Sequence, residues 1–249
     1  MTAYGPLAAG YDALTGDVPY EKFADWYETA FALKGGAVQS VLDLGCGTGT
    51  LSLLLAGRGY ELICTDASAE MLSVFQQKLW DLPEGVQRPL LLCQRSEELD
   101  LYGTVDACLC SLDGMNYLSP DALPEVFRRL RLFIAPGGVL AFDFLSPERL
   151  RSLDGQCFVD EDDGLLCLWR ANLEGEALHY GMDIFRQKGR LWQREQEEHT
   201  EYIHQPETLA ALLAAAGFGD IRLHTDGPQC DAGRLYYTAI RLKGDNEHG

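Results

Sequence analysis

The sequence lacks most features of a nucleic-acid-binding or membrane protein. Its 249 residues carry 20 Lys and Arg against 38 Asp and Glu, for a formal net charge of −18, and no basic cluster offsets this excess. Such a field repels phosphate backbones, so we expect no nucleic-acid partner. No apolar run reaches the roughly 18 residues of a membrane span, and no basic region precedes an apolar stretch at the N-terminus. We therefore expect a soluble, cytoplasmic protein with no membrane partner.

Metal-binding patterns are also missing. The eight cysteines include no CxxC pair and no spacing typical of metal ligands. Cys64, Cys93, Cys108 and Cys110 stand in apolar, strand-like runs, where a thiol behaves as a small hydrophobic side chain. The histidines likewise show no spacing typical of a metal site or a catalytic triad. We expect reduced cysteines and no metal.

What the sequence does contain is a regular alternation of short apolar runs and longer helical segments. Hydrophobic residues make up 47% of the chain, enough for a sizeable core. Near-continuous apolar strands that alternate with helices are typical of a parallel sheet covered on both faces. The predicted strands are 38–42, 61–65, 90–93, 105–110 and 139–144, followed near the C-terminus by 221–224 and 235–242; the predicted helices are 50–56, 69–80, 120–133 and 206–216.

The region before the last helix has a different pattern. Leu178, Tyr180, Met182 and Ile184 alternate with polar residues, and Lys188-Gly189 is typical of a hairpin turn. This predicts an antiparallel β insert over 154–204, with the acidic stretch 160–164 at a solvated hairpin tip. The expected fold class is α/β, a doubly wound, mostly parallel, seven-stranded Rossmann-like sheet with a small antiparallel insert. We expect an N-terminal helical lid over 1–37, a core over 38–153 and 205–243, and a disordered tail over 244–249.

The stretch VLDLGCGTG, residues 41–49, carries the most chemical information. Glycines where a strand gives way to a helix let the backbone approach a ligand closely. A dinucleotide site favours G-x-G-x-x-G. Here the third glycine comes one residue early, and Asp43 would place a carboxylate near any pyrophosphate. That placement suits a cationic ligand better.

The next strand ends with further binding residues. Asp66 can accept hydrogen bonds from both hydroxyls of an adenosine ribose. Ser68 is a plausible helix cap, and Met71 lies one turn further on, placed to face an adenine ring. Together these features predict a site for a nucleoside that is joined to an amino acid and a positive charge, as in S-adenosylmethionine.

On these residues the chain resembles the class I S-adenosylmethionine-dependent methyltransferases, and within them the bacterial, methyltransferase domain 25-like branch with an N-terminal Tyr-Asp helix and a small β insert. Further stretches that carry the resemblance are Tyr11-Asp12, DVPY at 17–20, SLDGMNYL at 111–118, PGG at 136–138 and AAAGFGDI near Gly217. The resemblance covers nearly the whole chain.

The resemblance implies S-adenosylmethionine as cofactor and assigns roles to its neighbours. The methionine part would lie against Asp43, Gly45, Cys46 and Gly47, the ribose against Asp66, and the adenine against Ala67, Met71, Ser96 and Glu97. Residues 111–117, which include Ser111, Asn116 and Tyr117, would line the methyl-transfer cleft. The lid would be formed by Tyr11, Tyr20 and Trp26. Arg95 stands where the family pattern carries Asp, which leaves Glu97 or a water molecule to contact the adenine amine.

The predicted reaction is the transfer of the sulfonium methyl to a small-molecule acceptor by in-line displacement. Because the cofactor is already activated, the protein mainly aligns the reactants and excludes water. Asp113 and His199 are candidates for a general base, although Asp113 and Asn116 equally fit loop caps and His199 a buried core residue. The alternatives are a non-catalytic S-adenosylmethionine-binding sensor or partner subunit, and a nicotinamide-dependent oxidoreductase. The acceptor and the oligomeric state stay open.

Overall fold

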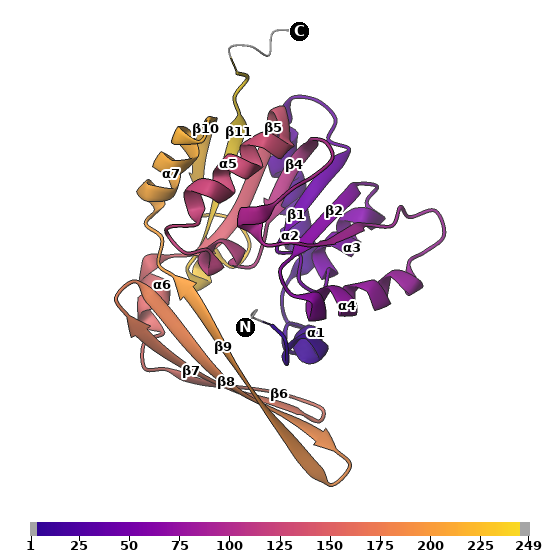
Figure 1. Ribbon diagram of the computed structural model, residues 1–249, viewed down its shortest axis with the longest axis vertical. Helices are drawn as coiled ribbons and strands as arrows, with labels where there is room; N and C mark the ends of the chain where they lie inside the picture. The colour runs from indigo at the N-terminus through magenta and orange to yellow at the C-terminus, as the bar shows by residue number, and fades with distance from the viewer. Residues whose placement is uncertain (1–3, 245–249) are drawn as a thin grey trace.

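Two β-sheets of different kinds organise the chain, as the computed structural model shows for residues 4–244 (Figure 1). The main sheet has the order β10-β11-β5-β4-β1-β2-β3, and all its pairings are parallel except those that β11 makes with β5 and β10. Its strands are β1 (Ser40–Leu44), β2 (Glu61–Asp66), β3 (Leu90–Cys93), β4 (Val105–Cys110), β5 (Ile134–Leu145), β10 (Phe218–His224) and β11 (Arg234–Arg241). The predicted fold class is thus confirmed.

Helices cover both faces of the main sheet because its apolar strands have no polar face to offer to water. On one face, Phe127 of α5 and Leu213 of α7 join a core cluster with Phe142. On the other, Tyr27 of α2 and Leu55 of α3 pack in a second cluster. The helices are α2 (Tyr20–Phe31), α3 (Thr50–Gly57), α4 (Ala69–Lys78), α5 (Leu123–Phe133), α6 (Pro147–Ser152) and α7 (Pro206–Ala215), with 3-10 turns η2 (Ala32–Lys34), η3 (Leu79–Asp81), η4 (Ser96–Glu98), η5 (Gly114–Tyr117) and η6 (Cys230–Ala232).

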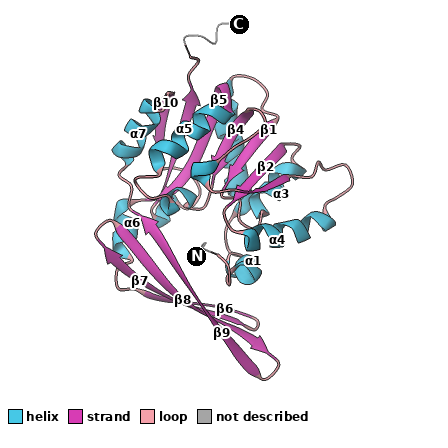
Figure 2. Cartoon of the chain, in the orientation of Figure 1, coloured by secondary structure: helices cyan, strands magenta, loops and turns pink. Residues whose placement is uncertain are grey.

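The second sheet, here called the insert sheet, is an antiparallel meander that extends away from the main sheet (Figure 2). Its predicted inward residues are all buried: Leu178, Tyr180, Met182 and Ile184. The acidic stretch lies at the β6–β7 turn, as expected. Its strands are β6 (Cys157–Asp162), β7 (Leu165–Glu174), β8 (Ala177–Lys188) and β9 (Leu191–Tyr202).

The N-terminal segment, residues 4–14, runs between α4 and the insert sheet (Figure 1). It contains the 3-10 turn η1 (Ala8–Gly10) and the single-turn helix α1 (Tyr11–Leu14). Leu7 packs on the insert sheet in one cluster with Leu165 and Met182. The helical structure predicted for this segment is therefore replaced by two short turns, because α4 on one side and the insert sheet on the other hold the segment.

Other element boundaries differ from the predictions for local reasons. The helix predicted at 120–133 begins at Leu123, because the Ser119 carbonyl accepts the N–H groups of Ala122 and Leu123 in a preceding turn. The strand predicted at 139–144 begins at Ile134. The PGG stretch at 136–138 forms a bulge within this strand, with Gly137 at φ +80°. Within the described residues, no helix is long and apolar enough to cross a membrane. Of the predicted tail, residues 245–249 lie outside the described residues.

Candidate functional site

A cavity of about 410 Å³ lies where the carboxyl ends of β1, β2 and β4 meet the N-terminal segment, and we call it the central cavity. Carboxyl ends of parallel strands are where ligands of doubly wound sheets bind, and the volume falls in the range of small-molecule sites. Most of the predicted cofactor residues line it: Tyr11, Tyr20, Gly45, Cys46, Gly47, Asp66, Ala67, Met71, Ser96, Glu97 and Ser111.

Asp66 joins the two loops that form the floor of the central cavity. Its Oδ2 accepts the backbone N–H of Gly47 and its Oδ1 that of Ser68, each at 2.8 Å. Burial raises the pKa of Asp66, although the N–H groups of Ser68, Gly47 and Ala67 oppose that shift. Each carboxylate oxygen keeps a further lone pair for a ligand hydroxyl. The arrangement can therefore hold two neighbouring hydroxyls without breaking either backbone contact.

The glycine loop provides space rather than side chains. Gly45 and Gly47 have φ of +77° and +54°, a region that glycine adopts without steric cost. No heavy atom lies within 4 Å of the position that a Cβ would occupy at either residue. Since both line the central cavity, a side chain there would fill ligand space. At Gly49, in contrast, a Cβ would lie 2.4 Å from the Phe75 ring, so that glycine serves the packing of α4.

The start of α4 supplies the apolar wall. Ser68 Oγ accepts the backbone N–H of Met71 at 3.1 Å, which confirms the predicted cap. Met71 is buried and faces the central cavity one turn into the helix. A flat ring against this wall would be held by contact with the thioether and by the neighbouring backbone.

The loop after β3 presents a paired charge. Arg95 Nε donates to Glu97 Oε1 at 2.7 Å, and both residues line the central cavity beside Ser96. The Arg95 side chain is largely exposed, so this pair contributes little to stability. Arg95 therefore occupies the Glu97 carboxylate that the sequence left as a candidate for the adenine amine.

Asp43 lies beneath the glycine loop and does not line the central cavity, contrary to the direct cofactor contact implied by the resemblance. It is almost fully buried, and its Oδ2 accepts from Ser52 Oγ. Its Oδ1 has no hydrogen-bond partner in the described part of the chain. Burial raises the pKa of Asp43 to about 7, against the hydrogen bond from Ser52. Asp43 can therefore influence a ligand only through the glycine loop that lies between them.

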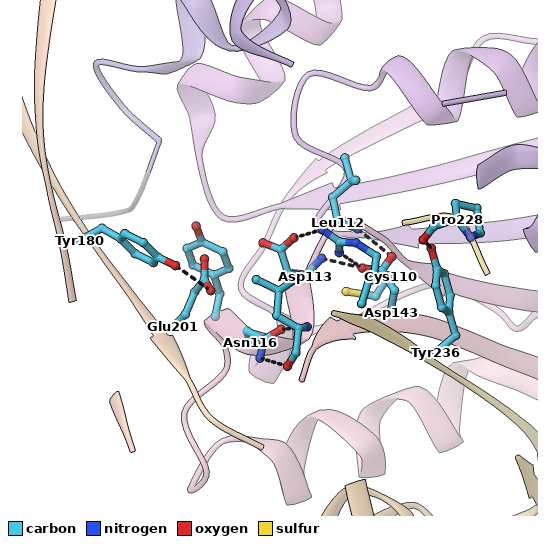
Figure 3. Close-up of polar contacts among 12 residues, drawn as sticks. Cys110, Leu112, Asp113, Asn116, Asp143, Tyr180, Glu201, Pro228 and Tyr236 are labelled. Carbon is cyan, nitrogen blue, oxygen red and sulfur yellow. Dashed lines mark hydrogen bonds and ion pairs between the residues drawn. The ribbon is translucent and has the colours of Figure 1, made fainter. Parts of the chain in front are cut away.

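Asn116 is also a structural residue rather than a wall of the cleft (Figure 3). It is fully buried; its Oδ1 accepts the Leu145 N–H at 2.8 Å, and its Nδ2 donates to the Tyr202 carbonyl at 3.1 Å. These bonds join the loop after β4 to β5 and β9. The predicted cofactor role of Asn116 is not supported, because its amide is already occupied by backbone groups.

Asp113 does not line the central cavity and belongs to a buried ionic cluster (Figure 3). Arg234 pairs with Asp113 at 2.7 Å and also with Asp143, whose other oxygen accepts from Tyr27 at 3.0 Å. Burial raises the pKa of Asp113, and the charge of Arg234 opposes that shift. Because Arg234 holds the Asp113 carboxylate and Asp113 does not line the central cavity, this carboxylate has no direct contact with a bound acceptor. This geometry argues against the predicted role of Asp113 as a general base.

His199 does not line the central cavity either, but it contacts a residue that does. Its Nδ1 lies 3.3 Å from the Tyr117 hydroxyl, and its Nε2 lies 2.9 Å from Glu197 Oε1. Tyr117 in turn contacts the Tyr4 hydroxyl at 2.6 Å, and both tyrosines line the cavity. The Tyr117 side chain thus connects His199 to the central cavity.

Several residues of this region were not found from the sequence. Tyr4 and Tyr202 line the central cavity, and Glu201 is buried beside it with the Tyr180 hydroxyl at 3.4 Å (Figure 3). Burial raises the pKa of Glu201 well above its ordinary value, and the charge of Asp113 adds to the shift. No spacing rule indicates these residues, because they come together only through the insert. Trp26, predicted in the lid, packs instead against Tyr27 and Tyr236.

These features fit S-adenosylmethionine. Asp66 offers free lone pairs to a ribose, Gly45 and Gly47 leave space, and Met71 provides an apolar wall. The carboxylate of Asp66 suits a cationic ligand better than a pyrophosphate, while the charge of Glu97 is balanced by Arg95. Among residues 4–244, no group of His, Cys, Asp or Glu is arranged to hold a metal ion.

Comparisons with known proteins agree with this geometry. A family model described as a methyltransferase domain matches residues 41–138. The solved structure of an S-adenosylmethionine-dependent methyltransferase from Clostridium acetobutylicum ATCC 824 superimposes with a TM-score of 0.82 at 26% identity, covering 97% of this chain and 99% of that one. The chain is thus a methyltransferase, and S-adenosylmethionine is its cofactor.

Among curated proteins, the chain is similar to the "Putative methyltransferase YqeM" of Bacillus subtilis (strain 168), with 29% identity over 250 residues, 96% of this chain and 98% of that one. The sugar N-methyltransferase KedS8 from Streptoalloteichus sp ATCC 53650 superimposes with a TM-score of 0.80 at 22% identity, covering 94% of this chain and 93% of that one. At that identity the second match shows the fold alone. These findings favour the predicted methyltransferase over the oxidoreductase and sensor alternatives.

The raised pKa of Asp43 predicts a pH dependence of stability. Because the pKa is about 7 in the folded state and 3.8 ordinarily, the folded protein holds the extra proton between these values. The free energy of unfolding should therefore fall as pH rises, by up to about 1.4 kcal/mol per pH unit. In Asp43→Asn this contribution is removed, so the variant should gain about 2 kcal/mol relative to wild type between pH 5 and pH 7. Urea unfolding of the cofactor-free proteins measures it, with the exposed Asp81→Asn as control; parallel pH profiles for wild type and Asp43→Asn would contradict it.

Proposed function

We propose that this methyltransferase acts on a small-molecule acceptor that binds in the central cavity on the side of the insert sheet. The observation that carries the proposal is that the cavity continues from Asp66 past Tyr117 to Tyr202, the last residue of β9. The N-terminal segment adds Tyr4 and Tyr11 to the same walls. A cavity that is walled by the insert and the N-terminus suits a compact acceptor better than a long polymer.

In this proposal each predicted cofactor residue that lines the cavity contacts the part of the cofactor that was predicted for it from the sequence. Asp66 holds the ribose, Met71 packs on the adenine, and Gly45, Cys46 and Gly47 surround the methionine part. Ala67, Ser96 and Glu97 border the adenine, and Ser111 lies at the end of β4 toward the acceptor. Tyr11 and Tyr20 exclude water from the cofactor. Asp43 lies beneath the glycine loop, where the protonation state of its carboxyl group sets the local charge.

When bound, S-adenosylmethionine supplies a methyl group activated by its positively charged sulfur. The chain then aligns the acceptor and accepts any proton that the acceptor loses. Burial, with a contribution from Tyr4, raises the pKa of Tyr117, so its phenol stays protonated at neutral pH. Tyr117 can accept a proton only by passing its own to His199 Nδ1, and Glu197 then lies next to the charged imidazole. His199 is thus the base in this proposal, and Tyr117 is its contact with the acceptor.

The fold of the sugar N-methyltransferase KedS8 supports a small acceptor, since a chain of closely similar architecture acts on a sugar there. The cytoplasmic location and the lack of a nucleic-acid or membrane partner stay predictions from the sequence.

The cofactor assignment predicts the effect of Asp66→Asn. The amide group would face a backbone N–H of Gly47 or Ser68, and one acceptor for the ribose would be lost. We expect the affinity for S-adenosylhomocysteine to fall about tenfold or more, because hydrogen bonds to a charged group are each worth about 1.5–3 kcal/mol. Isothermal titration calorimetry measures it, with the exposed Asp81→Asn as matched control. Unchanged affinity in a folded Asp66→Asn protein would remove the basis of the assignment.

The acceptor proposal predicts where a transferred methyl group is found. Wild-type protein is incubated with methyl-labelled S-adenosylmethionine and an extract of the source cells, which is then separated into small molecules, protein and nucleic acid. We expect enzyme-dependent label among the small molecules, and less of it with Asp66→Asn when the cofactor concentration is below its dissociation constant. Label confined to protein or nucleic acid would refute the proposal and give the acceptor class directly.

A further inference from the structure

The N-terminal segment connects the central cavity to the insert sheet. On one side, Tyr4 and Tyr11 line the cavity. On the other, Leu7 is buried against Cys167 and Ile184 of the insert sheet. Any contact that fixes this short segment therefore also fixes two walls of the cofactor site.

One insert side chain makes the main polar contact with the segment. The Glu197 carboxylate accepts the backbone N–H of Gly5 with Oε1 and that of Leu7 with Oε2, each at 2.9 Å. Glu197 is 6% exposed, and hydrogen bonds to a buried carboxylate are stronger than those between neutral groups. Arg186, from the neighbouring strand, donates to the Pro6 carbonyl. The insert sheet thus binds both edges of the backbone at residues 5–7.

His199 continues this contact toward the cavity. Its Nε2 lies 2.9 Å from Glu197 Oε1 and 3.3 Å from the Tyr4 backbone nitrogen. The His199 and Tyr4 rings pack with centroids 4.3 Å apart. At the cavity end, Ser68 Oγ donates to the Tyr4 carbonyl at 3.2 Å, next to the Asp66 contact. Tyr4 is therefore held by the insert sheet on one side and by the cofactor loop on the other.

The anionic state of Glu197 is favoured by the same partners. Burial alone would raise its pKa, but the bonds from His199, Leu7 and Gly5 bring it below the ordinary value. The Glu197 carboxylate lies outside the cavity walls, and two of its three donors are backbone N–H groups of the N-terminal segment. Its contacts are directed at the segment.

We propose that Glu197 is a positioning residue for cofactor retention, which holds residues 5–7 so that Tyr4 and Tyr11 close the central cavity. The proposal rests on the assignment of that cavity to S-adenosylmethionine. It makes the insert sheet, far from the glycine loop in sequence, part of the machinery that keeps the cofactor in place. Because coupling between two contacts is reciprocal, the bound cofactor must also stabilise the contact of Glu197 with the segment.

The first test compares Glu197→Gln with Glu198→Gln, an exposed residue on the same strand. Glutamine keeps one acceptor but turns an amide toward the second N–H donor. Surface plasmon resonance with S-adenosylhomocysteine should show about tenfold faster dissociation from Glu197→Gln and no change in Glu198→Gln. If Glu197→Gln lowers only the unfolding temperature and leaves dissociation unchanged, the residue merely supports the insert and the proposal is overturned.

The second test uses the wild-type protein, so it does not depend on whether the variant folds. Hydrogen–deuterium exchange is followed at the amides of Gly5 and Leu7 with and without S-adenosylhomocysteine. We expect at least tenfold slower exchange in the bound state. Unchanged exchange at both amides, with ligand bound, would overturn the role of Glu197 but leave the cavity assignment intact. Absence of any binding to the wild type would overturn the cavity assignment itself and this role with it.

Discussion

The contact on which the site depends is the Asp66 carboxylate between two backbone N–H groups. With one oxygen it fixes Gly47, and with the other it fixes Ser68 at the start of α4, each at 2.8 Å. These bonds hold the glycine loop and the helix cap at one distance, which leaves open the space that Gly45 and Gly47 create. They also offset part of the cost of keeping a carboxylate in a mostly buried place. The floor of the cavity is thus built before a ligand arrives.

The other half of the site comes from the N-terminal segment and the insert sheet, which lie outside the VLDLGCGTG loop and the Asp66 turn. The N-terminal segment contributes Tyr4 and Tyr11, and the insert sheet contributes Tyr202. Glu197 and His199 join these two parts through backbone N–H groups and a tyrosine ring. The loops at the carboxyl ends of the main-sheet strands thus form the part of the cavity that holds the cofactor. The insert sheet and the N-terminal segment form the opposite wall and the acceptor side. Differences in acceptor between proteins of this fold can then arise in the insert without altering the floor.

The sequence was sufficient for the sheet and for the cofactor floor, because those features depend on local patterns. Apolar runs of fixed spacing predict strands, and VLDLGCGTG followed by Asp66 and the Ser68 cap places the loop at a strand end. It was insufficient for Asp43, Asn116 and Asp113, which turn into the protein. Asp113 and Asn116 turn toward Arg234 and Tyr202, which lie on strands distant in sequence. Asp43 turns toward Ser52 of α3, and the spacing alone does not indicate that contact. Tyr4 and Glu197 were missed because their partners are far away in sequence: Tyr4 contacts His199, and Glu197 contacts Gly5 and Leu7.

The central claim is that one carboxylate holds the cofactor ribose while it keeps its backbone contacts. A crystal structure of the protein with S-adenosylhomocysteine tests this most directly. The account predicts both ribose hydroxyls within hydrogen-bond distance of the Asp66 oxygens, with the bonds from Gly47 and Ser68 retained and the adenine against Met71. A nucleoside bound elsewhere, or one that displaces Asp66 from Gly47, would contradict it.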